Sequence, residues 1–245
     1  WRNRARLSVE LKGPQDFVSR ADRDVELLIR TELAARFPSD GFLGEETAAH
    51  FTGPLDQCWI VDPIDGTHNF LRGIAYWNVA IAFVVEGSAQ CAAVYDPVHD
   101  ELYHAARGRG AWCDRGSGST QLRVADTASL GGSLVALGHH DRAPDQRYLE
   151  IRARMMASGV AVRNFGAAAL QLAHVAEGRL DGFIELQLSV WDAIGGLALI
   201  EEAGGYAAPF APGHPTQKTA CLGCAPGVAD ALVGLTGIGS SIASE

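Results

Sequence analysis

The chain has 245 residues, of which 47% are hydrophobic and 20% charged, and its formal net charge is −9. This composition is typical of a soluble globular protein with a large core. The acidic balance argues against the broad basic surface that nucleic acids bind, and no apolar run approaches the roughly 18 residues of a membrane-spanning helix. No secretory signal pattern is recognised, and the five cysteines, an odd number, favour free thiols in a reducing compartment. We therefore expect a cytoplasmic protein with neither a membrane nor a nucleic acid as its partner.

The two halves of the chain carry different patterns. A helix is predicted over residues 22–37, where apolar side chains recur on one stripe, with Asp22 at the N-cap and Pro38 beyond the end. Apolar alternation then predicts a strand over 57–62 and an antiparallel meander over 76–113. From about residue 130, strands alternate with helices, which are predicted over 145–158, 167–177 and 191–203. We expect an α+β lobe over residues 1–128 with an antiparallel sheet, and an α/β lobe over 129–245.

Acidic side chains fall at the ends of predicted elements in four separate places. These are Asp22 and Asp192 at helix starts, Asp62 and Asp65 at a strand end, and Glu45 and Glu46 in a loop. Proteins of the α/β class expose binding groups at such positions. Carboxylate oxygens are ligands that Mg²⁺ prefers, and bound cations would let an acidic protein accept an anionic substrate. The acids are therefore candidate metal ligands.

The stretch "WIVDPIDGTHNF", residues 59–70, places two of these carboxylates on a tight turn. Asp-Pro and Asp-Gly pairs are also ordinary turn chemistry, so the stretch alone leaves both interpretations open. Pro63 helps the chain reverse so that Asp62 and Asp65 can converge, which leaves the Ile64 carbonyl available as a further ligand. The turn could thus hold cations, provided that Glu45 and Asp192 lie near it.

The end of the same stretch has the features of an anion site. Gly66 tolerates a positive φ and the close approach of another group. The residues from Thr67 onward can start a helix whose backbone N–H groups face an anion. The sequence therefore favours a phosphate on this side of the turn.

Three blocks of sequence carry a family resemblance: "GEET" at 44–47, "WIVDPIDGTHNF" at 59–70 and "WDAIGGLALIEEAGG" at 191–205, with a weaker fourth, "KGPQDFVSRAD", at 12–22. In order and spacing they resemble the inositol monophosphatase family of Mg²⁺-dependent, lithium-sensitive phosphatases, within the wider group that includes fructose-1,6-bisphosphatase. The likeness spans nearly the whole chain, and the family's leading helix falls upstream of residue 1. The resemblance implies a layered αβαβα sandwich of the sugar-phosphatase type, and a homodimer.

The resemblance also implies a role for each matching residue. One metal would be held by Glu45, Asp62 and the Ile64 carbonyl, a second by Asp62, Asp65 and Asp192, and a weaker third by Glu45, which gives two to three Mg²⁺ ions. Gly66 and Thr67 would bind phosphate through their backbone N–H groups. The Thr67 hydroxyl paired with Asp22 would activate the attacking water, so that Asp22, Thr67, Glu45 and Asp65 form the catalytic set. Asp65, Ala168 and Glu185 would contact the substrate.

The chain departs from the family pattern at three positions. His68 stands where a second Thr is common, Ser189 replaces a frequent His, and Ser19 stands where Thr is usual. None of the three is a proposed metal ligand. The departures therefore bear on substrate preference rather than on the chemistry.

Other polar residues are open to two interpretations. Glu46 either orients a metal ligand or is solvated, and Lys12 either assists the metal site or is an exposed lysine. His139-His140-Asp141 is expected to be a loop that borders the substrate, and Glu201 and Glu202 are expected on the surface. Cys221 and Cys224 have the CxxC spacing without a second pair, so we expect no metal or redox role for them.

We predict a Mg²⁺-dependent phosphomonoester hydrolase that acts on a small polyol or sugar-like phosphate, with in-line attack of water on phosphorus. Inositol monophosphate is the favoured substrate, and histidinol phosphate, fructose 1,6-bisphosphate and 3′-phosphonucleotides are the alternatives. The rival hypothesis is a catalytically idle family member that binds a protein or nucleic-acid partner. The complete set of acids from Glu45 to Asp192 argues against that rival.

Overall fold

The computed structural model describes residues 9–13, 16–48, 51, 56–139, 146–214 and 216–240, with side chains from residue 20 onward. Its helices are α1 (Arg20–Arg36), α2 (Thr67–Arg72), α3 (Gln146–Ala157), α4 (Ala168–Ala176), α5 (Val190–Glu202) and α6 (Pro226–Thr236). Its strands are β1 (Val9–Gly13), β2 (Asp16–Ser19), β3 (Gly41–Gly44), β4 (Gln57–Asp65), β5 (Asn78–Val85), β6 (Ser88–Asp96), β7 (Glu101–Ala106), β8 (Ala111–Arg115), β9 (Gly118–Gln121), β10 (Leu134–Leu137), β11 (Ala161–Arg163), β12 (Gly182–Leu188), β13 (Tyr206–Ala207) and β14 (Thr219–Cys224).

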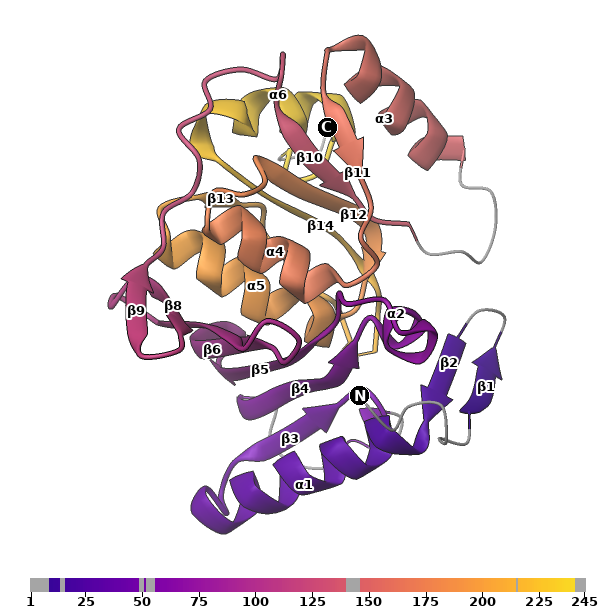
Figure 1. Cartoon of the computed structure of the whole chain (residues 1–245), viewed down its shortest axis with the longest axis vertical. Coiled ribbons are helices and arrows are strands. Elements are labelled where there is room, and N and C mark those ends of the chain that lie inside the picture. The colour runs from indigo at the N-terminus through magenta and orange to yellow at the C-terminus, as the bar shows by residue number, and fades with distance from the viewer. Residues whose placement is uncertain are drawn as a thin grey trace.

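These elements stack in alternating layers of helix and sheet (Figure 1). Helix α1 packs on β4 of a 7-stranded sheet with the order β3-β4-β5-β6-β7-β8-β9. Helices α4 and α5 lie between this sheet and a 5-stranded sheet with the order β11-β10-β12-β14-β13. Helices α3 and α6 pack on the far side of the second sheet, where their apolar side chains share a core with its strands. The predicted layered αβαβα sandwich is confirmed.

The larger sheet is antiparallel apart from the parallel pair β3 and β4. Strands β5 to β8 form the meander predicted over residues 76–113. Strand β4 runs to Asp65 rather than ending at Asp62, because its pairing with β5 resumes at Asp65 and Asn78 after an irregularity that follows Asp62. Such a bulge redirects side chains at a strand end, so both carboxylates leave the sheet at the same place.

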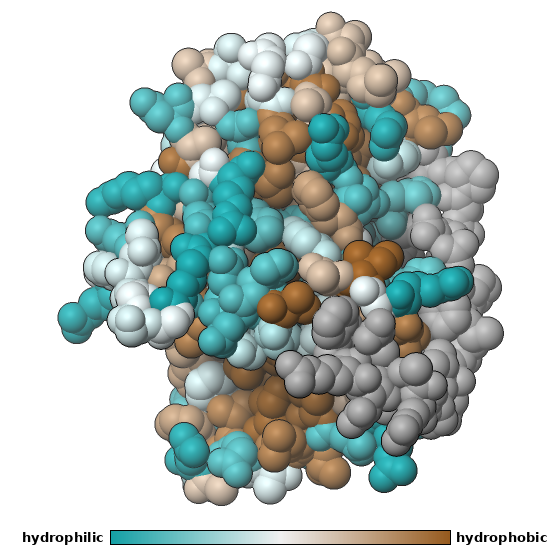
Figure 2. All heavy atoms as spheres, viewed as in Figure 1, coloured by the Kyte–Doolittle hydropathy of each residue, from teal (hydrophilic) through white to brown (hydrophobic). Residues whose placement is uncertain are grey.

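Helix α1 is present as predicted, and its apolar stripe is only partly covered: Val25, Ile29 and Leu33 are half-buried. The buried side chains of this helix are Asp22 and Glu26, whereas Leu28 is 62% exposed. Asp22 lies within the first turn instead of at the N-cap, because the helix begins at Arg20. In the space-filling view, brown surface gathers where α1, β3 and β4 lie (Figure 2), which agrees with the exposed apolar side chains of this helix.

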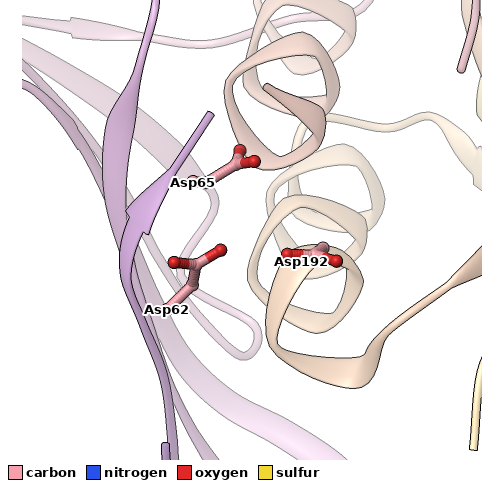
Figure 3. Close-up of side chains that lie close together, drawn as sticks. All are labelled: Asp62, Asp65 and Asp192. Atoms are coloured by element: carbon pink, nitrogen blue, oxygen red, sulfur yellow. The ribbon is translucent and has the colours of Figure 1, made fainter. Parts of the chain in front are cut away.

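Helices α4 and α5 pack directly against each other, and α5 carries a glycine at their contact. A Cβ on Gly196 would lie 2.3 Å from the Cβ of Leu172 on α4. The pair is buried within a cluster that includes Leu170, Leu199 and Phe183. This packing fixes the start of α5, and therefore Asp192, against the end of β4 (Figure 3).

The segment between β9 and β10 carries the chain from the larger sheet to the smaller one. The division into lobes at residues 128 and 129 stays a proposal. No helix in the described part of the chain has both the length and the apolar character needed to span a bilayer.

Candidate active site

Three carboxylates from two distant parts of the chain meet at one point. Asp62 and Asp65 project from the end of β4, and Asp192 faces them from the first turn of α5 (Figure 3). One oxygen from each of the three lies within 4.8 Å of the others. Hard oxygen donors in this number and spacing suit a divalent cation such as Mg²⁺.

Burial and mutual repulsion make the ionised state of this cluster costly. Burial, followed by the charges of Glu45 and Asp192, raises the pKa of Asp62 well above its ordinary value. Burial and the charge of Asp192 raise the pKa of Asp65 to about 7, and burial also raises the pKa of Asp192. A bound cation would favour the ionised forms, so the donor set fits a metal centre. The charge of Glu45 acts on Asp62, which places the fourth predicted acid near the cluster.

Asp65 is held by hydrogen bonds from two other elements. Its Oδ1 accepts the Ala168 N–H at 3.1 Å, and its Oδ2 accepts the Ala169 N–H at 2.7 Å. The N-cap of α4 is Ala167, which has no polar side chain, so Asp65 satisfies the start of this helix from across the site. The side chain of Asn78 on β5 also donates to Asp65 Oδ2. The sequence did not indicate either contact.

The turn after Asp62 has the geometry expected of a ligand loop. Asp62 Oδ1 accepts the Ile64 N–H at 2.9 Å, which orients this carboxylate. Gly66 has φ +86, and a Cβ there would lie 3.0 Å from the Ala167 Cβ, so both the backbone conformation and the space require glycine.

The predicted pairing of Thr67 with Asp22 is present. Thr67 Oγ1 lies 3.3 Å from Asp22 Oδ1 and 3.0 Å from the Ile64 carbonyl oxygen. Gly66 is the N-cap of α2, and Thr67 is the first residue inside the helix. Because its hydroxyl does not cap α2, Thr67 is available for a role at the site.

The predicted substrate residues Ala168 and Glu185 lie on α4 and β12. Ala168 is the buried first residue of α4, and its N–H is the donor to Asp65. Glu185 is a largely buried residue of β12, and its carboxylate lies over Gly138 at the end of β10, where a Cβ would meet Glu185 Oε2 at 2.0 Å. The charges of Glu185 and Asp192 both add to the effect of burial in raising the pKa of the Cys221 thiol, so both acids lie near this side chain.

The other residues that the sequence singled out, the histidine pair, Lys12 and the two CxxC cysteines, have the following surroundings. The His139 ring lies 4.4 Å from the ring of Tyr148, while His140 and Asp141 fall outside the described residues, as does the side chain of Lys12. Cys221 and Cys224 pack into different core clusters.

Two acidic residues are more than surface charges. Glu202 was predicted on the surface, but its two oxygens accept the N–H groups of Gly108 and Gly110 and so fix the turn between β7 and β8. Glu26 was not singled out at all, and its carboxylate accepts the Glu46 N–H in the loop that carries Glu45. The signal that could have found Glu26 is its spacing of four residues from Asp22, which puts both acids on one face of a helix.

Known proteins resemble this chain along most of its length. A family model described as the inositol monophosphatase family matches residues 2–233. An inositol-1-monophosphatase from Rhizobium meliloti is 40% identical over 220 residues, which cover 89% of this chain and 81% of that protein. The Nus factor SuhB of Escherichia coli K12 is 35% identical over 85% of this chain and 77% of its own length. The crystal structure of the suhB protein from Bartonella henselae, 35% identical, superposes with a TM-score of 0.83 over 95% of this chain and 89% of that one. With its carboxylate cluster and its layered fold, the chain belongs to the inositol monophosphatase family of phosphatases.

Proposed function

We propose that this protein is a Mg²⁺-dependent phosphomonoester hydrolase whose favoured substrate is an inositol monophosphate. The observation that carries the proposal is the convergence of Asp62, Asp65 and Asp192 beside Gly66 and Thr67. The relatives named inositol-1-monophosphatase, at 40% and 44% identity, support the substrate class. Histidinol phosphate, fructose 1,6-bisphosphate and 3′-phosphonucleotides remain the alternatives to be tested beside it.

The metal would be held by Glu45, Asp62, the Ile64 carbonyl, Asp65 and Asp192, with two to three Mg²⁺ ions in all. Divalent ions at such a site stabilise the charge that develops on the phosphoryl group and lower the pKa of bound water. The chain supplies the fixed positions of the carboxylates, which β4 and α5 present from opposite sides (Figure 3). Lithium sensitivity, as in the family that the sequence resembles, belongs to the same proposal.

The phosphate and the attacking water would be handled by the turn that follows β4. The backbone N–H groups of Gly66 and Thr67 would bind phosphate oxygens. The Thr67 hydroxyl would orient the water and pass a proton towards Asp22, whose Oδ1 lies 3.3 Å away. Because Asp22 is buried, it is oriented by α1 rather than by solvent.

The leaving alcohol would lie towards Glu185 and Ala168. A carboxylate accepts hydrogen bonds only, so Glu185 suits a leaving group that presents hydroxyl donors, as a polyol does. The backbone at Ala168 borders the same space because its N–H reaches Asp65. This arrangement is the basis for preferring a polyol phosphate over an aryl phosphate.

The second candidate function is binding of a macromolecular partner without turnover. The relatives named Nus factor SuhB, at 35% to 36% identity, are the observation that favours it. The complete acid cluster favours hydrolysis, because clustered buried carboxylates are costly to keep without a ligand. The proposal includes a homodimer, whose association can be measured independently of activity.

The test is phosphate release from a substrate panel with and without Mg²⁺. We expect turnover that depends on Mg²⁺, is highest with inositol monophosphate, and is abolished by EDTA. Asp192→Asn is the control for a contaminating phosphatase. Absence of Mg²⁺-dependent release from every phosphomonoester, by a protein that is folded and binds Mg²⁺, would overturn the enzymatic proposal in favour of the partner-binding one.

A further inference from the structure

Helix α1 buries a carboxylate that the proposed chemistry does not use. Most of this helix is exposed, yet the Glu26 side chain is only 2% exposed. Burial of a carboxylate is costly unless hydrogen bonds compensate for lost solvation. A helix with exposed leucines could have turned those residues inward instead. The inward placement of Glu26 therefore calls for an explanation.

The loop that carries Glu45 supplies that explanation. Glu26 Oε2 accepts the backbone N–H of Glu46 at 2.7 Å. A hydrogen bond between a backbone N–H and a carboxylate is stronger than one between two neutral groups. The bond connects α1 directly to the residue that follows Glu45.

A glycine on the other side of Glu45 makes room for the same carboxylate. A Cβ on Gly44 would lie 2.3 Å from Glu26 Oε2 and 2.4 Å from its Cδ. The carboxylate thus lies directly against the backbone of the loop, at the residue before Glu45 as well as at the residue after it. Two separate contacts with the same three-residue segment indicate a built arrangement.

The loop has a second anchor on the side of the metal cluster. The N–H of Glu45 donates to the carbonyl of Val61, the residue before Asp62, at 3.1 Å. Glu45 is therefore held between β4, through its own N–H, and α1, through the N–H of Glu46. This bond continues the pairing of β3 with β4, which ends at Gly44 and Val61, so beyond Glu45 the contact with Glu26 is what holds the backbone of Glu46.

We propose that Glu26 is a positioning residue that fixes the loop 44–46 and thereby sets the place of the Glu45 carboxylate relative to Asp62. This inference rests on the proposed function, in which Glu45 is a metal ligand. The same face of α1 carries Asp22, four residues earlier, which lies within hydrogen-bond distance of Thr67. One face of α1 thus orients both the metal-ligand loop and the residue that activates water.

The experiment compares Glu26→Ala with Glu26→Gln by the Mg²⁺ concentration that gives half-maximal phosphate release. Loss of a group that orients a metal ligand typically lowers metal affinity by about 10–100-fold, and we expect this range for Glu26→Ala. The amide oxygen of Glu26→Gln can accept the same N–H, so this variant should stay within about fivefold of wild type. Saturating Mg²⁺ should restore most of kcat in Glu26→Ala, because the groups that handle the water and phosphate are intact.

Thr236→Val is the matched control for lost stability. Thr236 is a buried residue of α6 whose hydroxyl donates to the Leu232 carbonyl at 2.7 Å, far from the site in the fold. We expect it to lower Tm without changing the half-activating Mg²⁺ concentration. An unchanged Mg²⁺ requirement in Glu26→Ala, with a Tm loss like that of the control, would overturn the proposal.

If Glu26→Ala does not fold, a variant at Gly44, the glycine against which Glu26 lies, tests the same proposal. Gly44→Ala should displace the flexible end of Glu26 and raise the Mg²⁺ requirement in the same direction, and a folded Gly44→Ala with a wild-type requirement would refute the idea. Failure of the proposed function gives a different result, since wild type would then release no phosphate. In that case the increase in Tm on addition of Mg²⁺ would still measure how tightly wild type and variants bind the ion. An equal increase in all of them would overturn the role of Glu26.

Discussion

Asn78 Nδ2 donates to Asp65 Oδ2 at 2.7 Å, and the two residues face each other across the β4–β5 ladder. Asn78 is fully buried, and its Oδ1 has no hydrogen-bond partner among the described residues. An unsatisfied buried acceptor costs roughly 1–3 kcal/mol. The Asn78 side chain therefore lowers stability through its unsatisfied oxygen, while its Nδ2 orients Asp65, a candidate metal ligand.

Replacement of Asn78 should weaken catalysis more than stability. Asn78→Ala removes one of three donors to Asp65, and we expect kcat/KM to fall by about 10–100-fold while Mg²⁺ binding weakens. Asn78→Asp should be worse, because it places a second carboxyl group against Asp65 in a buried site. Steady-state kinetics and Tm measure both effects. Ser133→Ala, which removes a buried hydroxyl bonded to the Leu130 carbonyl, is the control, and equal kinetic losses in the control would contradict this role.

Asp192→Asn should act in opposite directions on activity and on stability of the metal-free protein. The change removes one formal charge from a buried cluster in which burial and repulsion raise the carboxyl pKa values. In EDTA we expect Tm to rise by a few degrees, since about 1 kcal/mol corresponds to roughly 2–4 °C in a protein of this size. In Mg²⁺ we expect activity to fall by at least about 100-fold, because stabilisation of the transition state by the metal is worth several kcal/mol. A lower Tm in EDTA would show that the three acids do not repel one another.

Thr67→Ala should lower kcat by roughly 10²–10⁴-fold and leave KM within a small factor. Since Gly66, and not Thr67, is the N-cap of α2, the variant keeps the helix cap and loses only the hydroxyl bonds to Asp22 and the Ile64 carbonyl, at a cost of about 1–3 kcal/mol in stability. Thr67→Ser keeps the hydroxyl near Asp22 and should recover most of the rate. Normal turnover by Thr67→Ala would remove the pair from the mechanism.

Glu185→Gln should discriminate between substrates. A hydrogen bond to a charged group is worth roughly 1.5–3 kcal/mol, so kcat/KM for the true substrate should fall by about 10–150-fold. The aryl substrate p-nitrophenyl phosphate offers no donor at that position and should be hydrolysed at nearly the wild-type rate. Kinetics on inositol phosphate, histidinol phosphate and the aryl phosphate give the comparison. The same loss on all three would mean that Glu185 supports the fold rather than substrate choice.

His174 should make stability depend on pH below neutrality. Burial, followed by the charge of Arg179, lowers the pKa of His174 from 6.5 to about 4. Arg179 can only donate, at 3.3 Å to Nε2, so the neutral ring carries its proton on Nδ1 and donates to the Tyr76 oxygen at 3.1 Å. The other charges acting on the ring are those of Arg115, which also lowers the pKa, and of Glu101 and Asp96, which raise it.

The direction in which stability changes with pH follows from proton uptake by His174 on unfolding. Between pH 6.5 and about 4 the unfolded chain binds a proton that the folded ring does not, so the contribution of His174 is complete above pH 6.5 and is lost as pH falls. The contribution is at most roughly 3 kcal/mol. The carboxylate cluster acts in the opposite sense, so the useful quantity is the difference in unfolding free energy between wild type and His174→Gln at pH 5, 6 and 7. A difference that does not change with pH would show that the ring titrates normally.

The convergence of Asp62 and Asp65 on one turn could be predicted because these residues are close in sequence and their chemistry is local. Asp62, Asp65, Gly66 and Thr67 share one turn, and the bulge and the positive φ of Gly66 follow from those residue types. The proximity of Asp192 to these residues could be inferred only from the family resemblance, because nothing in the local sequence indicates that the start of α5 meets the end of β4.

The orienting residues were missed because their roles depend on register and packing. Asn78 begins β5 on the same buried face as Ala80 and Ala82, and only the pairing of β5 with β4 places it opposite Asp65. Glu26 was missed for a related reason: the apolar stripe through Val25 and Ile29 is only half-buried, and the fully buried side chains of α1 are Asp22 and Glu26. A polar residue in an otherwise apolar face is the signal that the sequence does offer.

The cluster of Asp62, Asp65 and Asp192 is divided between early and late parts of the chain. Asp62 and Asp65 are synthesised well before Asp192, and in the complete fold α5 packs between the two sheets. A nascent chain that ends before α5 therefore lacks the third carboxylate and has no closed cluster to load with metal. Because an ion that binds only the complete cluster stabilises the whole fold by mass action, metal loading would mark the completion of folding rather than precede it.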